Sequence, residues 1–303
     1  MNDTSRPLVV TAASGHIGSR LAHRLLDAGR PVRVMSRSEK NLAPFVERGA
    51  EGVTGSVEDV ENLKRAFDGA GMVFTLIPPD GGADYQQLQE RVSRAYVEAL
   101  KATGVQRVVN LSSVGAHLEE GTGPILGLAH HERRLDAIPG LDVLHLRPAS
   151  FMENHLMSLT AIRKQGLMAS ALAANVPMAQ IATRDIGDAA AEEMLEGSFT
   201  GRQVRELLGP RDVSMGETAK ILGDAIGKPN MAYVQLSEEQ AEKAFVAMGV
   251  PPKTAALMLE MYRGFNEAYI VPTQERSERT ETPTTLETWA EEVFAPAYRE
   301  AAG

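Results

Sequence analysis

Short apolar runs alternate with longer amphipathic segments through the first half of the chain. Such runs, each flanked by turn residues or a helix, predict buried parallel strands joined by crossover helices. Six of them lie in the first 150 residues, at 8–10, 31–36, a run ending near Val53-Thr54-Gly55, 72–77, 107–113 and 142–147. The pattern therefore predicts an α/β fold with a doubly wound parallel sheet of the Rossmann type.

Helix ends are marked between these runs. The first helix is expected to end at Gly29, a second to cover residues 60–67, and a long one to run from Tyr85 to about Ala102 before Gly104. Pro78 and Pro79 stop the fourth strand. A further helix is expected from about residue 131 to residue 137.

The regular alternation fails after residue 150. Residues 151–303 are predicted to form a smaller, mostly helical region that covers the carboxyl-end crevice of the sheet and holds a substrate pocket. The segment 183–188 leads into an alanine-rich helix, so residues 183–208 are expected to return to the sheet domain of residues 1–150. The two regions would then interleave.

The turn after the first apolar run carries the strongest chemical signal. Backbone amides of Gly15, His16 and Ile17 are expected to lie unpaired at a helix N-terminus, where the helix dipole favours a diphosphate. Gly18 would allow close packing of the helix on its strand, whereas Ala12 stands where the usual pattern has its first glycine. An ordinary strand-to-helix turn is the alternative interpretation.

The end of the second run indicates which dinucleotide would bind. Ser36 and Arg37 stand where an NAD site usually places a carboxylate. A guanidinium can form charge-assisted hydrogen bonds with a 2′-phosphate, so we expect NADP(H) to be preferred over NAD(H). The alternative is that Arg37 and Lys40 are merely solvated charges.

Composition narrows the remaining classes of function. The 303 residues include no cysteine, which excludes disulfides and thiolate chemistry and suits a cytoplasmic protein. The seven histidines show no metal-ligand spacing, so no metal is expected. A formal charge of −9 argues against nucleic acid as a partner, and no apolar run approaches the length of a membrane span. The oligomeric state stays open.

Several segments together resemble the NmrA-like family of atypical short-chain dehydrogenases. The resemblance covers nearly the whole chain, and the family includes NADPH-dependent quinone and azo-compound reductases as well as cofactor-sensing regulators. The segments that carry it are Val10-Thr11-Ala12-Ala13-Ser14-Gly15-His16-Ile17-Gly18, Asn110-Leu111-Ser112-Ser113-Val114-Gly115-Ala116, Leu146-Arg147-Pro148-Ala149-Ser150-Phe151-Met152-Glu153-Asn154, Thr183-Arg184-Asp185-Ile186-Gly187 and Thr282-Pro283-Thr284-Thr285-Leu286-Glu287.

The resemblance implies a role for particular positions around NADP(H). It implies that the diphosphate loop consists of Thr11, Ser14, Gly15, His16 and Ile17, and that the 2′-phosphate is contacted by Ser36 and Arg37. The adenine would be bordered by Gly55, Ser56 and Val57, and the nicotinamide ribose by Leu76, Ile77 and Pro78. The nicotinamide carboxamide would be approached by Pro148, Ala149 and Phe151, with Ser112 at a strand end nearby. Ser56 replaces a frequent Asp, which bears on affinity more than on fold.

The usual acid of short-chain dehydrogenases is missing. None of the six tyrosines has Lys four residues later, and by resemblance Leu128 and Glu132 take those places. His131, or His130, is a candidate replacement proton donor beside Ser112, because imidazole titrates near neutrality. Ser112 is itself a candidate for contact with the substrate, and the alternative is that its hydroxyl caps or positions the chain. A charged surface helix with incidental histidines is the alternative.

Two classes of function follow. The first is an NADPH-dependent oxidoreductase that transfers hydride to a quinone or a similarly conjugated, aromatic small molecule, whose reduced oxygen needs little protonation. The second is a non-catalytic regulator that senses NADP(H). Asn154, with Phe151 and Met152, is a candidate for contact with the substrate. An apolar stripe at Leu257, Met258, Met261, Tyr262, Phe265 and Tyr269 would line the pocket or pack in the core.

Overall fold

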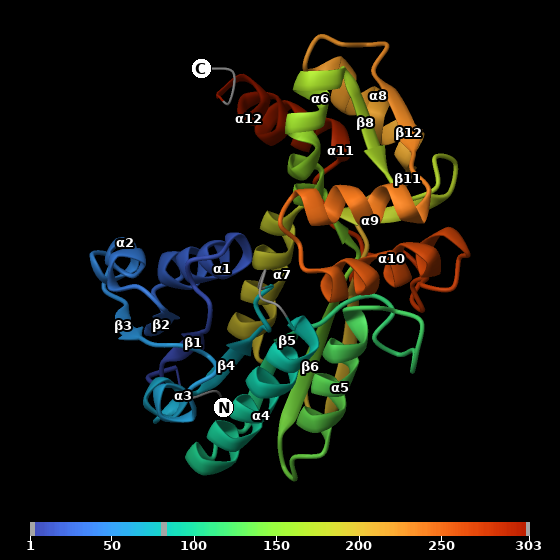
Figure 1. Ribbon diagram of the computed structural model, residues 1–303. Helices are drawn as coiled ribbons and strands as arrows, with labels where there is room; N and C mark the ends of the chain where they lie inside the picture. Colours follow the sequence, from blue (N-terminus) through green and yellow to red (C-terminus); the bar gives the residue numbers. More distant parts are fainter. Residues whose placement is uncertain (1–3, 80–83, 301–303) are drawn as a thin grey trace.

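A seven-stranded parallel sheet forms the centre of the computed structural model, which describes residues 4–79 and 84–300 (Figure 1). The strand order is β10-β6-β5-β4-β1-β2-β3, and every neighbouring pair runs parallel. The strands are β1 (Leu8–Val10), β2 (Val32–Ser36), β3 (Glu51–Thr54), β4 (Met72–Thr75), β5 (Arg107–Leu111), β6 (Asp142–Pro148) and β10 (Arg202–Leu207). This confirms the predicted Rossmann-type α/β fold and its six early strands.

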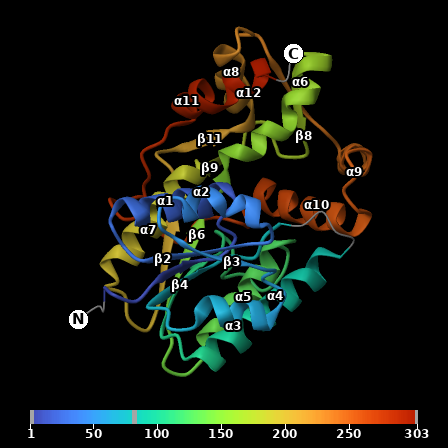
Figure 2. The same ribbon diagram turned by 90° about the vertical axis from the view of Figure 1, so that its left-hand side faces the viewer.

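Helices cover both faces of the sheet, as Figure 2 shows. One face carries α1 (His16–Asp27) and α7 (Thr183–Glu196), and the other carries α3 (Val60–Phe67), α4 (Tyr85–Thr103) and α5 (Ile125–Asp136). Short helices η1 (Glu39–Asn41) and α2 (Ala43–Val46) precede β3. The prediction for α3 was correct, whereas α5 begins at Ile125, directly after Pro124, rather than near His131.

The segment from 183 to 207 belongs to the sheet domain. Helix α7 packs against α1, and β10 adds a seventh strand beside β6. Residues 273–280 cover the free edge of β10, and we call this segment the strap. Glu206 is fully buried and its carboxylate accepts hydrogen bonds from the backbone N–H and hydroxyl of Thr273 and from the N–H of Gln274. A helix and a strand from the second half of the chain thus lie with the elements of residues 8–148.

The smaller region stacks on the carboxyl ends of the strands, at the top of Figure 1. It combines helices with a three-stranded sheet (β11-β9-β7) and a two-stranded sheet (β12-β8), around a core that contains Trp289. Its strands are β7 (Ser150–Phe151), β8 (Leu167–Ser170), β9 (Pro177–Ile181), β11 (Asp212–Ser214) and β12 (Ala232–Gln235). Its helical segments are η2 (Met152–Ser158), α6 (Leu159–Gln165), α8 (Met215–Ala225), α9 (Glu238–Ala247), α10 (Pro252–Asn266), α11 (Leu286–Trp289), η3 (Ala290–Phe294) and α12 (Ala295–Glu300).

None of the helices in the described ranges has the length and apolarity to cross a membrane.

Candidate functional site

The turn from β1 to α1 presents backbone amides at the carboxyl edge of the sheet. The N–H of Gly15 donates to the carbonyl of Ala12 at 3.1 Å, so the expectation that this amide is unpaired was wrong. This hydrogen bond closes a tight turn from Ala12 to Gly15. The amides of His16 and Ile17 begin α1, which has no side-chain cap, and within the described residues neither has a backbone partner outside the helix. Two amides therefore remain to face an anion.

Two small residues fix the shape of this turn. A Cβ built on Gly18 would lie 2.6 Å from the Ala12 carbonyl oxygen, which shows why the helix requires glycine there. Ala12 itself adopts a left-handed conformation with φ 50°. An L-residue is strained in that region, so the chain keeps the glycine-type turn although its first glycine is absent.

The ends of β1, β2 and β3 bring several of the predicted cofactor residues together. The hydroxyl of Ser36 donates to Ser14 Oγ at 3.2 Å, and the N–H of Gly55 donates to the Ser36 carbonyl at 2.9 Å. Arg37 follows directly and is exposed at this edge. A guanidinium, two hydroxyls and the bare end of α1 thus lie along one side of the sheet.

Some predicted cofactor residues have their side chains turned inward. Thr11 is fully buried, and its hydroxyl donates to the Phe74 carbonyl at 2.8 Å and accepts from Tyr96 at 3.0 Å. The Tyr96 hydroxyl also reaches the carbonyl of Leu76 at 3.0 Å, and burial raises the pKa of this phenol. The Thr11 hydroxyl is therefore occupied by the protein. Tyr96, missed in the sequence because it lies mid-helix, anchors the ends of β1 and β4.

Among the residues predicted to border the adenine and the nicotinamide ribose, some side chains also turn into the protein and others lie at the surface. Ser56 Oγ accepts from the Glu58 N–H at 3.2 Å and so stabilises its own turn. Val57 and Ile77 are buried in the core, while Pro78 is partly exposed at the end of the fourth strand.

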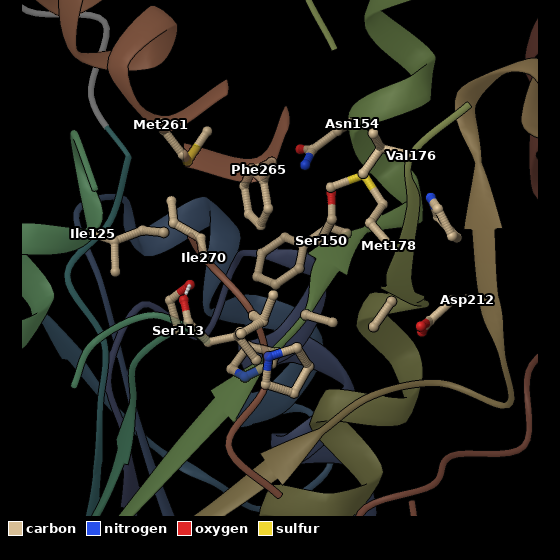
Figure 3. Close-up of a pocket in the computed structure, with 18 of the residues that line it drawn as sticks. Ser113, Ile125, Ser150, Asn154, Val176, Met178, Asp212, Met261, Phe265 and Ile270 are labelled. Atoms are coloured by element: carbon tan, nitrogen blue, oxygen red, sulfur yellow. Dashed lines mark hydrogen bonds between the residues drawn. The ribbon is translucent and has the colours of Figure 1, made fainter. Parts of the chain in front are cut away.

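A cavity of about 350 Å³ opens beyond the ends of β5 and β6 (Figure 3). Its floor comes from the sheet domain, and its walls and roof come from β7, β9, α10 and the segment 268–272. The lining residues are Pro79, Ser113, Val114, Ile125, Pro148, Ala149, Ser150, Phe151, Asn154, Val176, Pro177, Met178, Ala179, Asp212, Met261, Phe265, Ala268, Ile270, Val271 and Pro272. Most of this surface is apolar.

Four of the residues predicted to contact the cofactor or the substrate, Pro148, Ala149, Phe151 and Asn154, line this cavity. Ser112 lies just behind it, and its neighbour Ser113 faces it while donating to the Val114 carbonyl at 2.9 Å. Ser112 is only 4% exposed, and its hydroxyl has no partner among the described residues. A buried hydroxyl without a partner at a strand's carboxyl end suits a polar ligand atom.

His131 does not reach the cavity, contrary to the proton-donor hypothesis. Its ring is fully buried between α4 and α5, where Nδ1 hydrogen-bonds Ser93 Oγ at 2.9 Å, and burial lowers its pKa to about 3. The imidazole is therefore neutral at physiological pH and has no proton to give as an acid. His130 is exposed on the same helix and is absent from the cavity lining. The error arose because α5 packs beside α4 on one face of the sheet, and among its residues Ile125, at its first turn, lines the cavity.

Glu132, the acidic position of the family pattern, holds the sheet rather than the cavity. Its carboxylate accepts two hydrogen bonds from Arg147, at 2.9 and 2.5 Å, and both side chains are largely buried. The carboxylate raises the pKa of Arg147 against the opposing effect of burial. The pair ties α5 to β6 beneath the cavity floor.

The predicted apolar stripe divides between two surfaces. Met261 and Phe265 point into the cavity from α10, as Figure 3 shows, whereas Met258 and Tyr262 pack on a separate cluster around Phe245. Met152 is buried in the core of the smaller region, and Tyr269 is exposed. Val176, Met178, Asp212 and Ile270 were missed, since they come from separate loops and strands that no single periodic pattern connects.

The residues at the sheet edge fit a dinucleotide phosphate. Two amides at the start of α1, the exposed Arg37 and the buried Ser112 follow the carboxyl ends of β1, β2 and β5, respectively. In the described part of the chain, no group of three or more His, Asp or Glu side chains could hold a metal ion. The fold is an α/β fold of the NAD(P)-binding Rossmann type, and an apolar cavity opens at the carboxyl edge of its sheet.

Comparison with known proteins identifies the family. The sequence profile of the NmrA-like family matches residues 4–290, and the chain belongs to that family. An NAD(P)H azoreductase from Xenophilus azovorans is 28% identical over 257 residues, which cover 84% of this chain and 86% of that protein.

Solved structures share the fold. The NADPH-dependent quinone oxidoreductase QOR2 from Escherichia coli, complexed with NADPH, superposes with a TM-score of 0.80 at 22% identity, covering 95% of this chain and 99% of that one. NmrA, a negative transcriptional regulator complexed with NADP, gives a TM-score of 0.71 at 17% identity, covering 99% and 98%. Known relatives thus include NAD(P)H-dependent reductases as well as a regulator.

Proposed function

We propose that the protein is an NADPH-dependent reductase that transfers hydride to a quinone or another conjugated small molecule. The observation that carries this proposal is the composition of the cavity lining. Its polar side chains are Ser113, Ser150, Asn154 and Asp212, and the described lining contains no histidine, lysine or tyrosine. A reaction there must proceed without a strong, positioned acid.

The demand for a proton separates the acceptor classes. Hydride addition to a simple ketone produces an alkoxide with a pKa of about 16, so it depends on a proton donor. A reduced quinone oxygen resembles a phenol, with a pKa of about 10, and solvent can protonate it after hydride transfer. The apolar cavity favours such an acceptor, since it can orient a flat, conjugated ring system beside the cofactor.

Bound NADPH would supply the hydride from its nicotinamide ring. The protein's own groups bind and orient it in this proposal. The amides of His16 and Ile17, with Ser14, would hold the diphosphate, and Arg37 with Ser36 would hold the 2′-phosphate. The Ser112 hydroxyl would meet a polar group of the nicotinamide end. Pro148, Ala149 and Phe151 lie between that end and the acceptor cavity.

The cofactor assignment is tested by Arg37→Ala. Loss of charge-assisted hydrogen bonds should weaken NADPH binding by roughly 10- to 100-fold, with little change in NADH binding. Titration calorimetry with both coenzymes measures the two affinities, and Lys243→Ala serves as an exposed control on α9. Equal losses for the two coenzymes would contradict a 2′-phosphate contact.

The reaction is tested by following NADPH oxidation with a panel of quinones, azo dyes, enones and simple ketones. We expect turnover with quinones or azo compounds and none with simple ketones. Rapid ketone reduction without quinone reduction would contradict the acceptor class.

The missing Tyr-x-x-x-Lys acid favours a second candidate, a regulator that senses NADP(H) without turnover. The regulator NmrA has a similar fold, which makes this alternative concrete. Tight NADPH binding with no oxidation across the whole panel would support it.

A further inference from the structure

The acceptor cavity offers no positive charge. Among its described lining residues there is no lysine, arginine or histidine, and the charged side chain that is present, Asp212, is acidic. The cationic side chains on the α10 roof are engaged elsewhere. Lys253 contacts Asp84, and Arg263 donates two hydrogen bonds to Glu238.

Asp212 is itself neutralised by the protein. Its carboxylate forms a close ion pair with Arg276, whose guanidinium also donates to the carbonyls of Gly209 and Leu208. Arg276 is thus committed to its own surroundings and is absent from the cavity lining. A ligand meets a wall that is apolar with a few neutral hydrogen-bonding groups, chiefly Ser150 and Asn154, as Figure 3 shows.

An anionic ligand would enter this cavity at a cost. Desolvation of a sulfonate, carboxylate or phosphate in an apolar site is unfavourable unless a cation or several N–H donors replace water. The formal charge of the whole chain, −9, adds a long-range field that repels anions during approach. Desolvation and repulsion both weaken the binding of an anion. A neutral conjugated ring gives up little hydration free energy when it enters the cavity.

We propose that the cavity selects uncharged conjugated acceptors and rejects anionic ones, and that the absence of a lining cation determines this specificity. The inference rests on the proposed function for its choice of site and deepens it to a charge class. It also predicts that a single cation placed at the cavity wall would admit anionic acceptors.

Val271 is a suitable position for that cation. It lines the cavity, yet it is 43% exposed and lies outside the helices and strands, so a lysine there can keep its ammonium hydrated. Val234 on β12 is 40% exposed and absent from the cavity lining, so it provides a matched control. Val271→Lys and Val234→Lys make the same chemical change at two similarly exposed valines.

The experiment compares 1,4-naphthoquinone with 1,4-naphthoquinone-2-sulfonate. For the wild-type protein we expect kcat/KM to be at least about tenfold higher for the neutral quinone after correction for the intrinsic reactivity of each compound with NADPH. Tenfold corresponds to about 1.4 kcal/mol. In Val271→Lys the ratio of sulfonate to neutral kcat/KM should rise about fivefold or more, and in Val234→Lys it should stay at the wild-type value.

Equilibrium dialysis separates this inference from the proposed reaction. Both compounds are dialysed against the protein saturated with the 1,4,5,6-tetrahydro analogue of NADPH, which transfers no hydride and whose ring is uncharged like that of NADPH. Tighter binding of the neutral compound, with the shift in Val271→Lys, supports charge selection even if neither compound is reduced, in which case the proposed reaction alone fails. Equal binding of the two compounds, no measurable binding of either, or the same shift in both lysine variants would overturn the inference.

Discussion

The two sides of the cavity are built in different ways. The sheet side consists of strand ends held in register by the parallel ladder, with β5 and β6 paired through five consecutive residues on each strand. The roof side consists of α10 and residues 268–272, attached to their surroundings largely by side-chain hydrogen bonds such as those of Asn266. The sheet side is thus fixed by backbone geometry, while the roof depends on individual side chains.

This difference separates groups suited to a coenzyme shared by many reactions from groups suited to one particular acceptor. A coenzyme common to many reactions can be bound by backbone amides and strand ends, which tolerate changes of side chain. An acceptor must be recognised by side chains, and these come from segments far apart in the chain. We therefore expect mutations on the sheet side to affect folding and those on the roof to affect acceptor kinetics.

The largest effect is expected on the sheet side, from Gly18→Ala. The added methyl group would lie 2.6 Å from the Ala12 carbonyl oxygen, and only a shift of the backbone could relieve that contact. We expect a loss of about 2–3 kcal/mol in the free energy of unfolding, measured with urea. Gly15→Ala is the matched control, because its nearest neighbour would be 3.6 Å away. Equal losses in the two variants would contradict the close-approach argument.

A pH effect of about 2 kcal/mol is expected from His131. Its pKa is about 3 in the folded protein and 6.5 ordinarily, so protonation favours the unfolded chain. Above pH 6.5 the imidazole is mostly neutral in both states, so His131 has little effect on the free energy of unfolding. As the pH falls below 6.5, protonation of the unfolded chain lowers the free energy of unfolding progressively, by about 2 kcal/mol at pH 5. Urea unfolding at pH 7.5 and pH 5 should show a smaller loss for His131→Gln than for the wild type. If the free energy of unfolding fell equally with pH in the two proteins, the claim that the buried His131 imidazole stays neutral would be wrong.

On the roof, Asn266→Ala should cost about 1–2 kcal/mol locally. The side chain accepts from the Ala173 N–H at 2.6 Å and donates to the Ala171 carbonyl at 2.9 Å, so both bonds are lost. Hydrogen exchange should accelerate in α10 and leave the central strands unchanged, and KM for the acceptor should rise. The exposed neighbour Glu267→Ala should show neither change. Faster hydrogen exchange throughout the sheet as well would show that the roof and the sheet side are not independently stabilised.

The smallest effect is expected from Ala12→Gly, which should stabilise the fold by about 0.5–1 kcal/mol. Glycine removes the strain of φ 50°, and the greater freedom of the unfolded chain offsets part of that gain. Differential scanning calorimetry should show a Tm increase of about 1–4 °C. A lower Tm would indicate that the methyl group of Ala12 contributes packing that outweighs its strain.

The fold was predictable from the sequence because its signals are local. Strands β1, β2, β4, β5 and β6 are short, mostly apolar runs, and α3 and α4 have clear ends at residues such as Phe67 and Gly104. The turn before Gly18 was readable for the same reason, although the Gly15 amide proved to be paired. Strand β10 has no such run, and its place in the sheet was not readable as a strand from the sequence.

The cavity was only partly predictable because its walls are assembled by tertiary packing. Phe151 and Asn154 follow a recognisable strand, and Met261 and Phe265 share one helix face. Val176 and Asp212 carry no signal that links them to that helix. His131 was misplaced because composition alone does not tell which face of α5 meets the sheet, and its neutral state depends on burial by α4.

The strap along β10 has a consequence for association between molecules. The last strand of a parallel sheet presents a row of free amides and carbonyls that another polypeptide can pair with. Here the side-chain amide of Gln274 bonds the β10 backbone at Glu206 N and the Val204 carbonyl, and the Leu208 N–H donates to the Thr280 carbonyl. A foreign strand would have to displace this cover first, so a segment of the protein's own chain blocks strand addition at the β10 edge of the sheet.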